Sequence, residues 1–201
     1  HCDFPYGVNM NKSSMTNASA WATYEDSADI YMELCKALIE NKDRLFSSNS
    51  FLMFWYSEKF GDFTRELFEA AGFKRWTHPL IWHKSCNSGI LPDYRRGPRH
   101  TYENAMVFTL GDPFIVSPVA DSFSGAASKT QGHVSEKPVE MLSHFFRLFV
   151  DEHTKMLDPT AGSHTSVATA LRLGAKHVTG IELEKTHHDS GLLLIKQTLG
   201  E

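Results

Sequence analysis

Two short motifs in the last quarter of the chain, Asp158-Pro-Thr-Ala-Gly-Ser-His-Thr165 and Gly180-Ile-Glu182, frame a single helical pattern. The pattern runs from about Thr165 to Leu173 and ends at Gly174, and a short apolar run precedes each motif. This order predicts a βαβ unit whose first strand-to-helix turn is built from small residues. Free N–H groups at the helix start and an acid after the second strand are suited to an adenosine-containing cofactor. The same residues also fit an ordinary tight turn and a surface glutamate, so this unit alone leaves both interpretations open.

The remaining sequence predicts further alternation of strands and helices around this unit. The pattern indicates strands at 50–56, 80–82, 105–109 and 177–181, and helices at 29–44, 62–71 and from Pro138 to about Phe149. We expect the 50–56 strand to be buried on both faces, Asp62 to cap its helix and Gly72 to end it. Residues 111–132 are rich in Ser, Gly, Ala and Pro, which predicts a mobile loop. The fold class is therefore α/β, in one domain over 1–201.

Composition excludes several classes of protein. The 201 residues contain 20 Lys and Arg against 24 Asp and Glu, so a histone-like nucleic-acid binder is excluded. No apolar run approaches the ~18 residues of a membrane span, which indicates a cytoplasmic protein. Three scattered cysteines and the spacing of the histidines predict neither a disulfide framework nor a bound metal.

Two further motifs accompany the C-terminal pair: Asp3-Phe-Pro-Tyr-Gly7 at the start of the chain and Glu136-Lys137-Pro138 at the start of its last third. Together the blocks resemble the amino-group DNA methyltransferases, which methylate adenine N6 or cytosine N4 with S-adenosylmethionine. That family carries D-P-P-Y, E/Q-K-P and D-P-F-x-G-S-G-T blocks, the last followed by G-I-E. The catalytic block comes first here, which is similar to the β-type order. The resemblance implies a Rossmann-like methyltransferase sheet with flanking helices.

The resemblance also implies a catalytic role for the first block. An exocyclic amino group is a poor nucleophile, so an enzyme must polarise it and align it with the methyl group. Asp3 would accept one N–H of the amino group and the carbonyl of Phe4 the other. Pro5 would stiffen the loop, and Tyr6 would stack on a base flipped out of duplex DNA.

The cofactor S-adenosylmethionine is assigned by the same resemblance to two other regions. His133 and Lys137 are expected near its carboxylate, and Glu182 at its ribose. The remaining expected cofactor residues form the turn, namely Asp158, Pro159, Thr160, Ala161, Gly162, Ser163, His164 and Thr165.

The most basic stretch of the chain predicts a contact to nucleic acid. Residues 86–100 are turn-rich and carry four basic side chains that are candidates for phosphate contacts, namely Arg95, Arg96, Arg99 and His100. A solvated charged loop is the alternative interpretation. We expect duplex DNA as the partner and adenine N6 as the preferred target, because a leading Asp in the catalytic block is commoner with adenine.

Two residues depart from the family pattern and motivate rival hypotheses. Phe4 replaces a proline, adding bulk beside the target amine, and His164 replaces a glycine, where an imidazole could weaken cofactor binding. A catalytically weakened DNA-binding or assembly module is therefore one alternative. A cytosine-N4 or RNA amino-methyltransferase is another, favoured by the acidic net charge and by a short recognition region.

The order of the motifs also predicts something about the ends of the chain. In the β-type order two strands precede the catalytic loop, and they are absent here. We therefore expect a fragment truncated at the N-terminus, completed by an upstream domain or by a partner subunit. Its compactness fits a bacterial or phage protein, as in restriction-modification systems.

Overall fold

The computed structural model describes residues 1–7, 26–87, 95, 97–127 and 136–200. Two compact units make up the chain. One contains Cys2–Thr77 and Met106–Pro113, and the other contains His1, His78–Ala105 and Phe114–Glu201. Strand β5 (Tyr102–Leu110) is divided between the two units. Its residues up to Ala105 belong to the unit of Phe114–Glu201, and those from Met106 belong to the unit of Cys2–Thr77.

In the unit of Cys2–Thr77 the chain forms the strands β1 (Cys2–Asp3), β2 (Ser50–Tyr56) and β3 (Lys74–Arg75). β1 pairs in parallel with β2, and β3 pairs antiparallel with the second half of β5. β2 lies between β1 and β5. Its residues from Leu52 to Tyr56 are all buried, which confirms the predicted strand and its burial on both faces.

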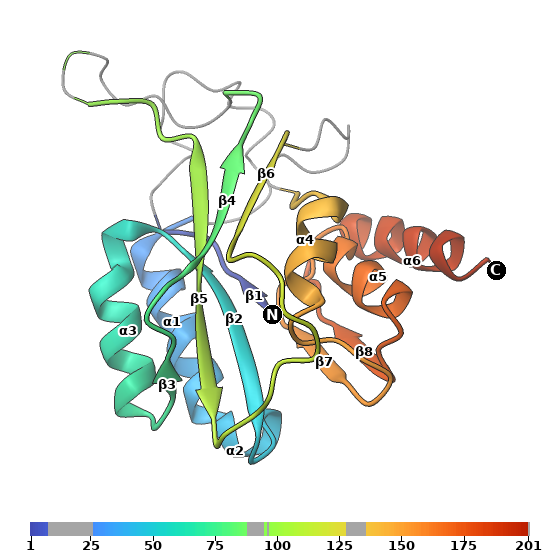
Figure 1. Ribbon diagram of the computed structural model, residues 1–201, viewed down its shortest axis with the longest axis horizontal. Helices are drawn as coiled ribbons and strands as arrows, with labels where there is room; N and C mark the ends of the chain where they lie inside the picture. Colours follow the sequence, from blue (N-terminus) through green and yellow to red (C-terminus); the bar gives the residue numbers. More distant parts are fainter. Residues whose placement is uncertain (8–25, 88–94, 96, 128–135, 201) are drawn as a thin grey trace. The chain divides into compact units, whose positions relative to one another are not determined.

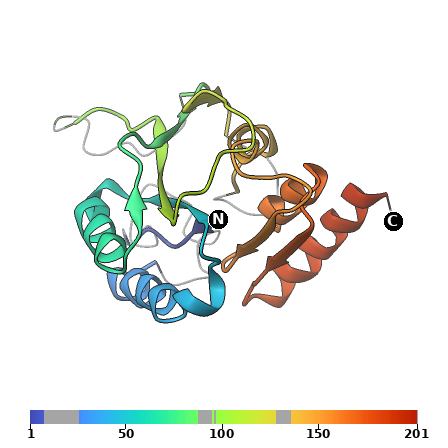
Figure 2. The same cartoon turned by 60° about the horizontal axis from the view of Figure 1, so that its bottom comes forward.

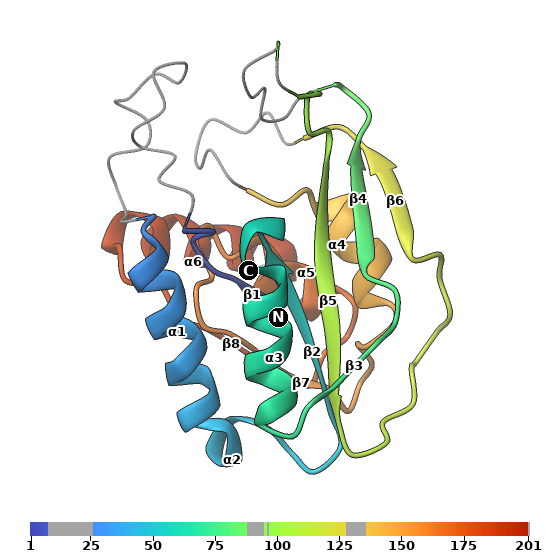
Figure 3. The same cartoon turned by 90° about the vertical axis from the view of Figure 1, so that its left-hand side faces the viewer.

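The helices of this unit are α1 (Ala28–Glu40), the short α2 (Lys42–Leu45) and α3 (Gly61–Ala70), which follows the 3-10 turn η3 (Glu58–Phe60). α1 and α3 lie side by side along the strands (Figure 3). Their apolar faces meet the strands in one aromatic core, where Phe68 packs 5.2 Å from Phe54 and 5.1 Å from Phe108 between ring centroids.

Two helices differ from the sequence prediction in their bounds or in their N-terminal caps. The predicted helix 29–44 is broken at Asn41, and its first turn is capped by Ser27, whose Oγ accepts the N–H of Ile30 at 3.3 Å. Asp62 does not cap α3, because η3 leads into the helix and places Asp62 inside its first turn. There its negative charge interacts favourably with the helix dipole. Gly72 follows the helix with φ of 92°, as predicted.

In the other unit, which contains His78–Ala105 as well as Phe114–Glu201, β4 (Leu80–Lys84) pairs antiparallel with the first half of β5. β4 also pairs in parallel with β6 (Ser122–Gly125) (Figure 1). The prediction that 111–132 lacks a packed element is wrong for β6. Backbone pairing does not require apolar side chains, so the Ser-rich β6 carried no strand signal. The segment is also tied to the α4 region, because the N–H of Val116 donates to the carbonyl of Leu148 at 2.8 Å.

The predicted βαβ unit is confirmed. β7 (Lys155–Asp158) leads through α5 (Thr165–Arg172) to β8 (His177–Gly180), and the two strands pair in parallel. Figure 2 shows both strands, in orange, beside the orange and red helices. α4 (Val139–Phe146) and α6 (Lys185–Leu199) pack against α5, and α6 was not predicted.

None of the helices within the described ranges is long and apolar enough to cross a membrane.

The three cysteines give a direct test of the core that β1 and α1 share. Cys2 and Cys35 are buried and Cys86 is exposed, and burial raises the pKa of the Cys35 thiol to about 12. We expect a thiol-specific disulfide reagent at pH 8 to modify Cys86 rapidly and the other two only after denaturation, because the thiolate is the reacting form. Mass spectrometry of digested protein identifies the modified residues. Rapid labelling of Cys35 in native protein would contradict this core.

Candidate functional site

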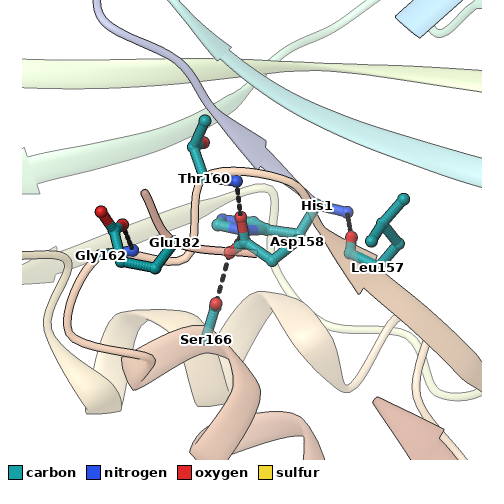
Figure 4. Close-up of polar contacts among 7 residues, drawn as sticks. All are labelled: His1, Leu157, Asp158, Thr160, Gly162, Ser166 and Glu182. Atoms are coloured by element: carbon teal, nitrogen blue, oxygen red, sulfur yellow. Dashed lines mark hydrogen bonds and ion pairs between the residues drawn. The ribbon is translucent and has the colours of Figure 1, made fainter. Parts of the chain in front are cut away.

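The turn between β7 and α5 is organised by the carboxylate of Asp158, which is only 2% exposed. One oxygen accepts the N–H of Thr160 at 3.1 Å, and the other accepts the hydroxyl of Ser166 and lies 2.7 Å from Nδ1 of His1 (Figure 4). The backbone amino group of His1 also donates to the carbonyl of Leu157 at 3.1 Å. Asp158 therefore joins the end of a strand, the turn and the first turn of a helix.

Burial has an electrostatic consequence for this carboxyl group. Desolvation raises the pKa of Asp158, while the positive charge of the chain's amino group at His1 and the hydrogen bonds from Ser166 and Thr160 act in the opposite direction. The sequence placed Asp158 among the cofactor residues. Its burial and its three partners show that it shapes the turn.

Glu182 closes the turn from the other side of the βαβ unit. Its Oε2 accepts the N–H of Gly162 at 2.8 Å (Figure 4). Its Oε1 accepts the N–H of Glu184 at 2.8 Å. The N–H of Ala161 donates to the carbonyl of Ile181 at 2.8 Å in the same place. The two motifs that the sequence analysis paired are thus in direct contact.

The turn leaves room for a ligand at its backbone. Gly162 has φ of 51°, and apart from Gly162 and its two chain neighbours no atom of the described residues lies within 4 Å of the position that a Cβ would take there. Ala161 and Ser163 on either side are small. The first-turn N–H groups of α5 have no partner within the helix and point out of its start. These features fit an anionic or adenosine-containing ligand.

Charged residues before α4 contact the same helix and the neighbouring strands. Glu136 accepts the hydroxyl of Thr165 at the start of α5. Nζ of Lys137, a buried side chain, lies 3.2 Å from Oε2 of Glu103, whose Oε1 lies 2.5 Å from Nζ of Lys84. The two lysines thus share the carboxylate of one glutamate.

His164 occupies a strained position that the sequence analysis had questioned. Its φ of 62° lies in the left-handed region, and it precedes the first residue of α5. The residue is 3% exposed, and its ring packs against Gly191 of α6. The ring therefore fills the interior of the unit.

The catalytic block lies in the unit of Cys2–Thr77, where Asp3 ends β1 opposite Trp55 of β2. Phe4 is 3% exposed and meets Phe54 edge-on, with 5.3 Å between ring centroids. The expectation that Phe4 adds bulk beside a target amine is therefore wrong, because its ring belongs to the aromatic core. Asp3, Pro5 and Tyr6 are partly exposed.

A buried carboxylate that the sequence analysis missed holds the end of this block. Oδ1 of Asp26, a residue only 4% exposed, accepts the N–H of Gly7 at 2.6 Å. Gly7 has φ of 66°, and a Cβ there would lie 2.9 Å from the ring of Phe60 and 3.0 Å from Cα of Ala28. Only glycine fits this turn. The glycine was visible in the sequence, but nothing there paired it with an acid 19 positions away.

The basic stretch is only partly described. Arg95, Arg99 and His100 are exposed, while Arg96 and His133 lie outside the described residues. Within the described part of the chain, no group of three or more His, Cys, Asp or Glu side chains is arranged to hold a metal ion.

Comparison with solved structures places this fold among DNA methyltransferases. The M1.HpyAVI–SAM complex matches with a TM-score of 0.67 and 17% identity over 81% of this chain and 82% of its own. TTHA0409 of Thermus thermophilus, in complex with S-adenosyl-L-methionine, matches with 0.59 and 14% over 85% and 79%. The PvuII cytosine-N4-specific DNA methyltransferase matches with 0.60 and 11% over 88% and 78%. The predicted Rossmann-like methyltransferase sheet with flanking helices is confirmed.

Sequence comparison agrees with this likeness. The Escherichia coli (strain K12) protein named "Putative methylase YubD" is 29% identical over 122 residues, which are 60% of this chain and 51% of that protein. The chain therefore spans about half the length of this curated relative. No model of a known protein family matches the chain.

The burial of Asp158 predicts a specific dependence of stability on pH. The unfolded chain releases the Asp158 proton near the ordinary pKa of 3.8, whereas the folded chain holds it to higher pH. The folded state then binds more protons, so its stability falls as pH rises through this window. We expect the free energy of unfolding of wild type relative to Asp158→Asn to decrease between pH 4 and pH 7, measured by urea denaturation. An increase over that range would contradict the burial.

Removing the acceptor for Gly7 tests the role of Asp26. Asp26→Ala leaves a buried N–H without its partner, and we expect it to lower the free energy of unfolding by about 1–3 kcal/mol. Asp26→Asn keeps an oxygen acceptor and should cost less, so it is the matched control. Equal effects of the two variants in urea denaturation would refute the importance of this hydrogen bond.

Proposed function

We propose that this chain is the core of an S-adenosylmethionine-dependent DNA methyltransferase that methylates an exocyclic amino group of a flipped base, with adenine N6 as the preferred target. The observation that carries the proposal is the closed turn, in which Glu182 binds Gly162 beside the start of α5. The fold likeness to DNA methyltransferases supports it. The residue motifs extend the likeness to chemistry, which fold alone does not decide.

The turn and Glu182 are assigned to the cofactor. Each carboxylate oxygen of Glu182 accepts one backbone N–H and keeps lone-pair capacity for a ribose hydroxyl. The small residues Ala161, Gly162 and Ser163 allow close approach to the backbone. Lys137, with His133, is assigned to the carboxylate of the cofactor.

The catalytic block is assigned to the amino group. When bound, S-adenosylmethionine would supply an electrophilic methyl group to the amino nitrogen, and its sulfur would keep the electron pair of the broken carbon–sulfur bond. The carboxylate of Asp3 and the carbonyl of Phe4 accept the two N–H bonds and hold the nitrogen lone pair in line. The displaced proton passes to Asp3 or to solvent. Tyr6 supplies an aromatic face for the flipped base.

DNA is assigned to the basic stretch around Arg95 and Arg99. Their exposed guanidinium groups, with His100 and Arg96, suit phosphate oxygens. An upstream domain or a partner subunit is proposed to supply further recognition of the DNA sequence.

Cytosine N4 is the second candidate target. The similarity to the PvuII cytosine-N4-specific enzyme favours it, since that fold neighbour has a TM-score of 0.60. Incubation with duplex DNA, single-stranded DNA or RNA, followed by nucleoside mass spectrometry, separates the targets. We expect N6-methyladenine in duplex DNA. N4-methylcytosine would support the second candidate, and methylated RNA alone would contradict a DNA substrate.

Asp3 is the residue whose loss should separate chemistry from cofactor binding. We expect Asp3→Ala to lower the methyl-transfer rate roughly 100-fold or more, the scale for removing a group that handles a proton in the reaction. Cofactor affinity should change only a few-fold. Asp43→Ala, an exposed acid of α2, is the control. An unchanged transfer rate in Asp3→Ala would remove Asp3 from catalysis.

Glu182 tests the other half of the proposal. Glu182→Ala removes a charged acceptor, and we expect S-adenosylmethionine binding to weaken by about 1–3 kcal/mol in calorimetric titration. Glu184→Ala is the matched control, because the Glu184 backbone N–H that contacts Glu182 remains. Unchanged affinity in Glu182→Ala would exclude this side chain from the cofactor site.

A further inference from the structure

His164 combines an unfavourable backbone conformation with a well-packed side chain. Among the described residues, only Asn87 and His164 have positive φ without being glycine. A β-carbon makes this conformation costly, so the surroundings must hold it in place. The backbone takes part, because the N–H of His164 donates to the carbonyl of Ala161 at 2.8 Å.

The ring of His164 reaches back into the turn. Its Nδ1 lies 3.0 Å from the carbonyl oxygen of Gly162. A carbonyl oxygen only accepts, so this nitrogen carries the proton and donates it. Since the N–H of Gly162 donates to Glu182 at 2.8 Å, both backbone polar groups of Gly162 are held by side chains.

Two glycines provide the space for the ring. A Cβ on Gly191 would lie 2.3 Å from Nδ1 and 2.5 Å from Cγ of His164, and a Cβ on Gly180 would lie 3.1 Å from its Cδ2. Gly191 is inside α6, where glycine is an unfavourable residue, so its role there is to admit the ring. The edge of His188, also in α6, meets the ring at 5.6 Å between centroids.

We propose that His164 is a positioning residue, which fixes Gly162 and joins α6 to the turn that binds the cofactor. The inference rests on the proposed function for the identity of the ligand. It reverses the expectation that the imidazole obstructs the cofactor, because the residue is 3% exposed and its ring lies against Gly180 and Gly191. Where the family pattern has a flexible glycine, this chain has a histidine, which orders the turn before the ligand binds.

The packing half of the proposal is tested by a double-mutant cycle on the whole chain. Gly191→Ala should lower the melting temperature of wild type by several degrees, because its Cβ overlaps the ring. In the His164→Gly background the same change should leave the melting temperature unchanged or raise it, because alanine favours the helix. The control is Ser190→Ala, next to Gly191. Gly200→Ala would not serve, because the φ of 76° at this position would strain an alanine. A fall of equal size in both backgrounds would overturn the proposal.

The positioning half is tested by hydrogen exchange and by ligand binding. His164→Gly should speed exchange of the Gly162 N–H about tenfold and weaken S-adenosylmethionine binding at least fivefold. His164→Asn should restore part of both, because asparagine tolerates positive φ and can donate to the Gly162 carbonyl.

Three outcomes of these measurements are distinguishable. Wild-type exchange in His164→Gly, or tighter binding of the cofactor by this variant, would overturn the positioning role. Absence of S-adenosylmethionine binding by wild type would instead overturn the proposed function, and the exchange rates would still decide whether His164 orders the turn. Faster exchange with weaker binding, restored in part by asparagine, supports both.

Discussion

The carboxylate of Asp158 is the constraint on which the candidate site depends. It is buried at the end of β7, and its hydrogen bonds to Thr160 and Ser166 fix how the chain turns into α5. An uncompensated buried carboxylate would be very unfavourable, so these partners must be present together. Once the turn is fixed, Gly162 presents its N–H to Glu182 and its carbonyl to His164. We expect a ligand at the start of this helix to be bound by its first-turn N–H groups.

The sequence predicted those parts of the fold whose signals are local. The run Ser50–Tyr56 is apolar or aromatic after its first residue, and the structure makes it a strand with the same bounds that is buried from Leu52 on. Gly72 and Gly174 end helices with positive φ, as their positions after apolar stripes indicate. The turn and Glu182 could be paired from the spacing within one βαβ unit, since that topology brings successive strand ends together. These predictions needed no knowledge of distant contacts.

The parts that could not be predicted depend on contacts between distant residues. Phe4 looked like an obstacle in a catalytic motif, yet its ring packs on Phe54 in the core. His164 looked like a defect in a glycine motif, and only the positions of Gly180 and Gly191 show where its ring goes. Asp26 contacts Gly7 across 19 positions, a pairing that no local pattern indicates. In each case the side chain satisfied a packing or hydrogen-bonding requirement that the sequence does not display.

A ligand titration monitored at each backbone amide tests the central claim, that the turn from Asp158 to Thr165 holds S-adenosylmethionine. In two-dimensional NMR spectra of the labelled chain, the largest shifts of amide signals should fall on Gly162, Ser163 and the amides around Glu182. These shifts should saturate at micromolar ligand, which corresponds to a binding free energy of about −8 kcal/mol. Shifts confined to other parts of the chain, or none at millimolar ligand, would contradict the account.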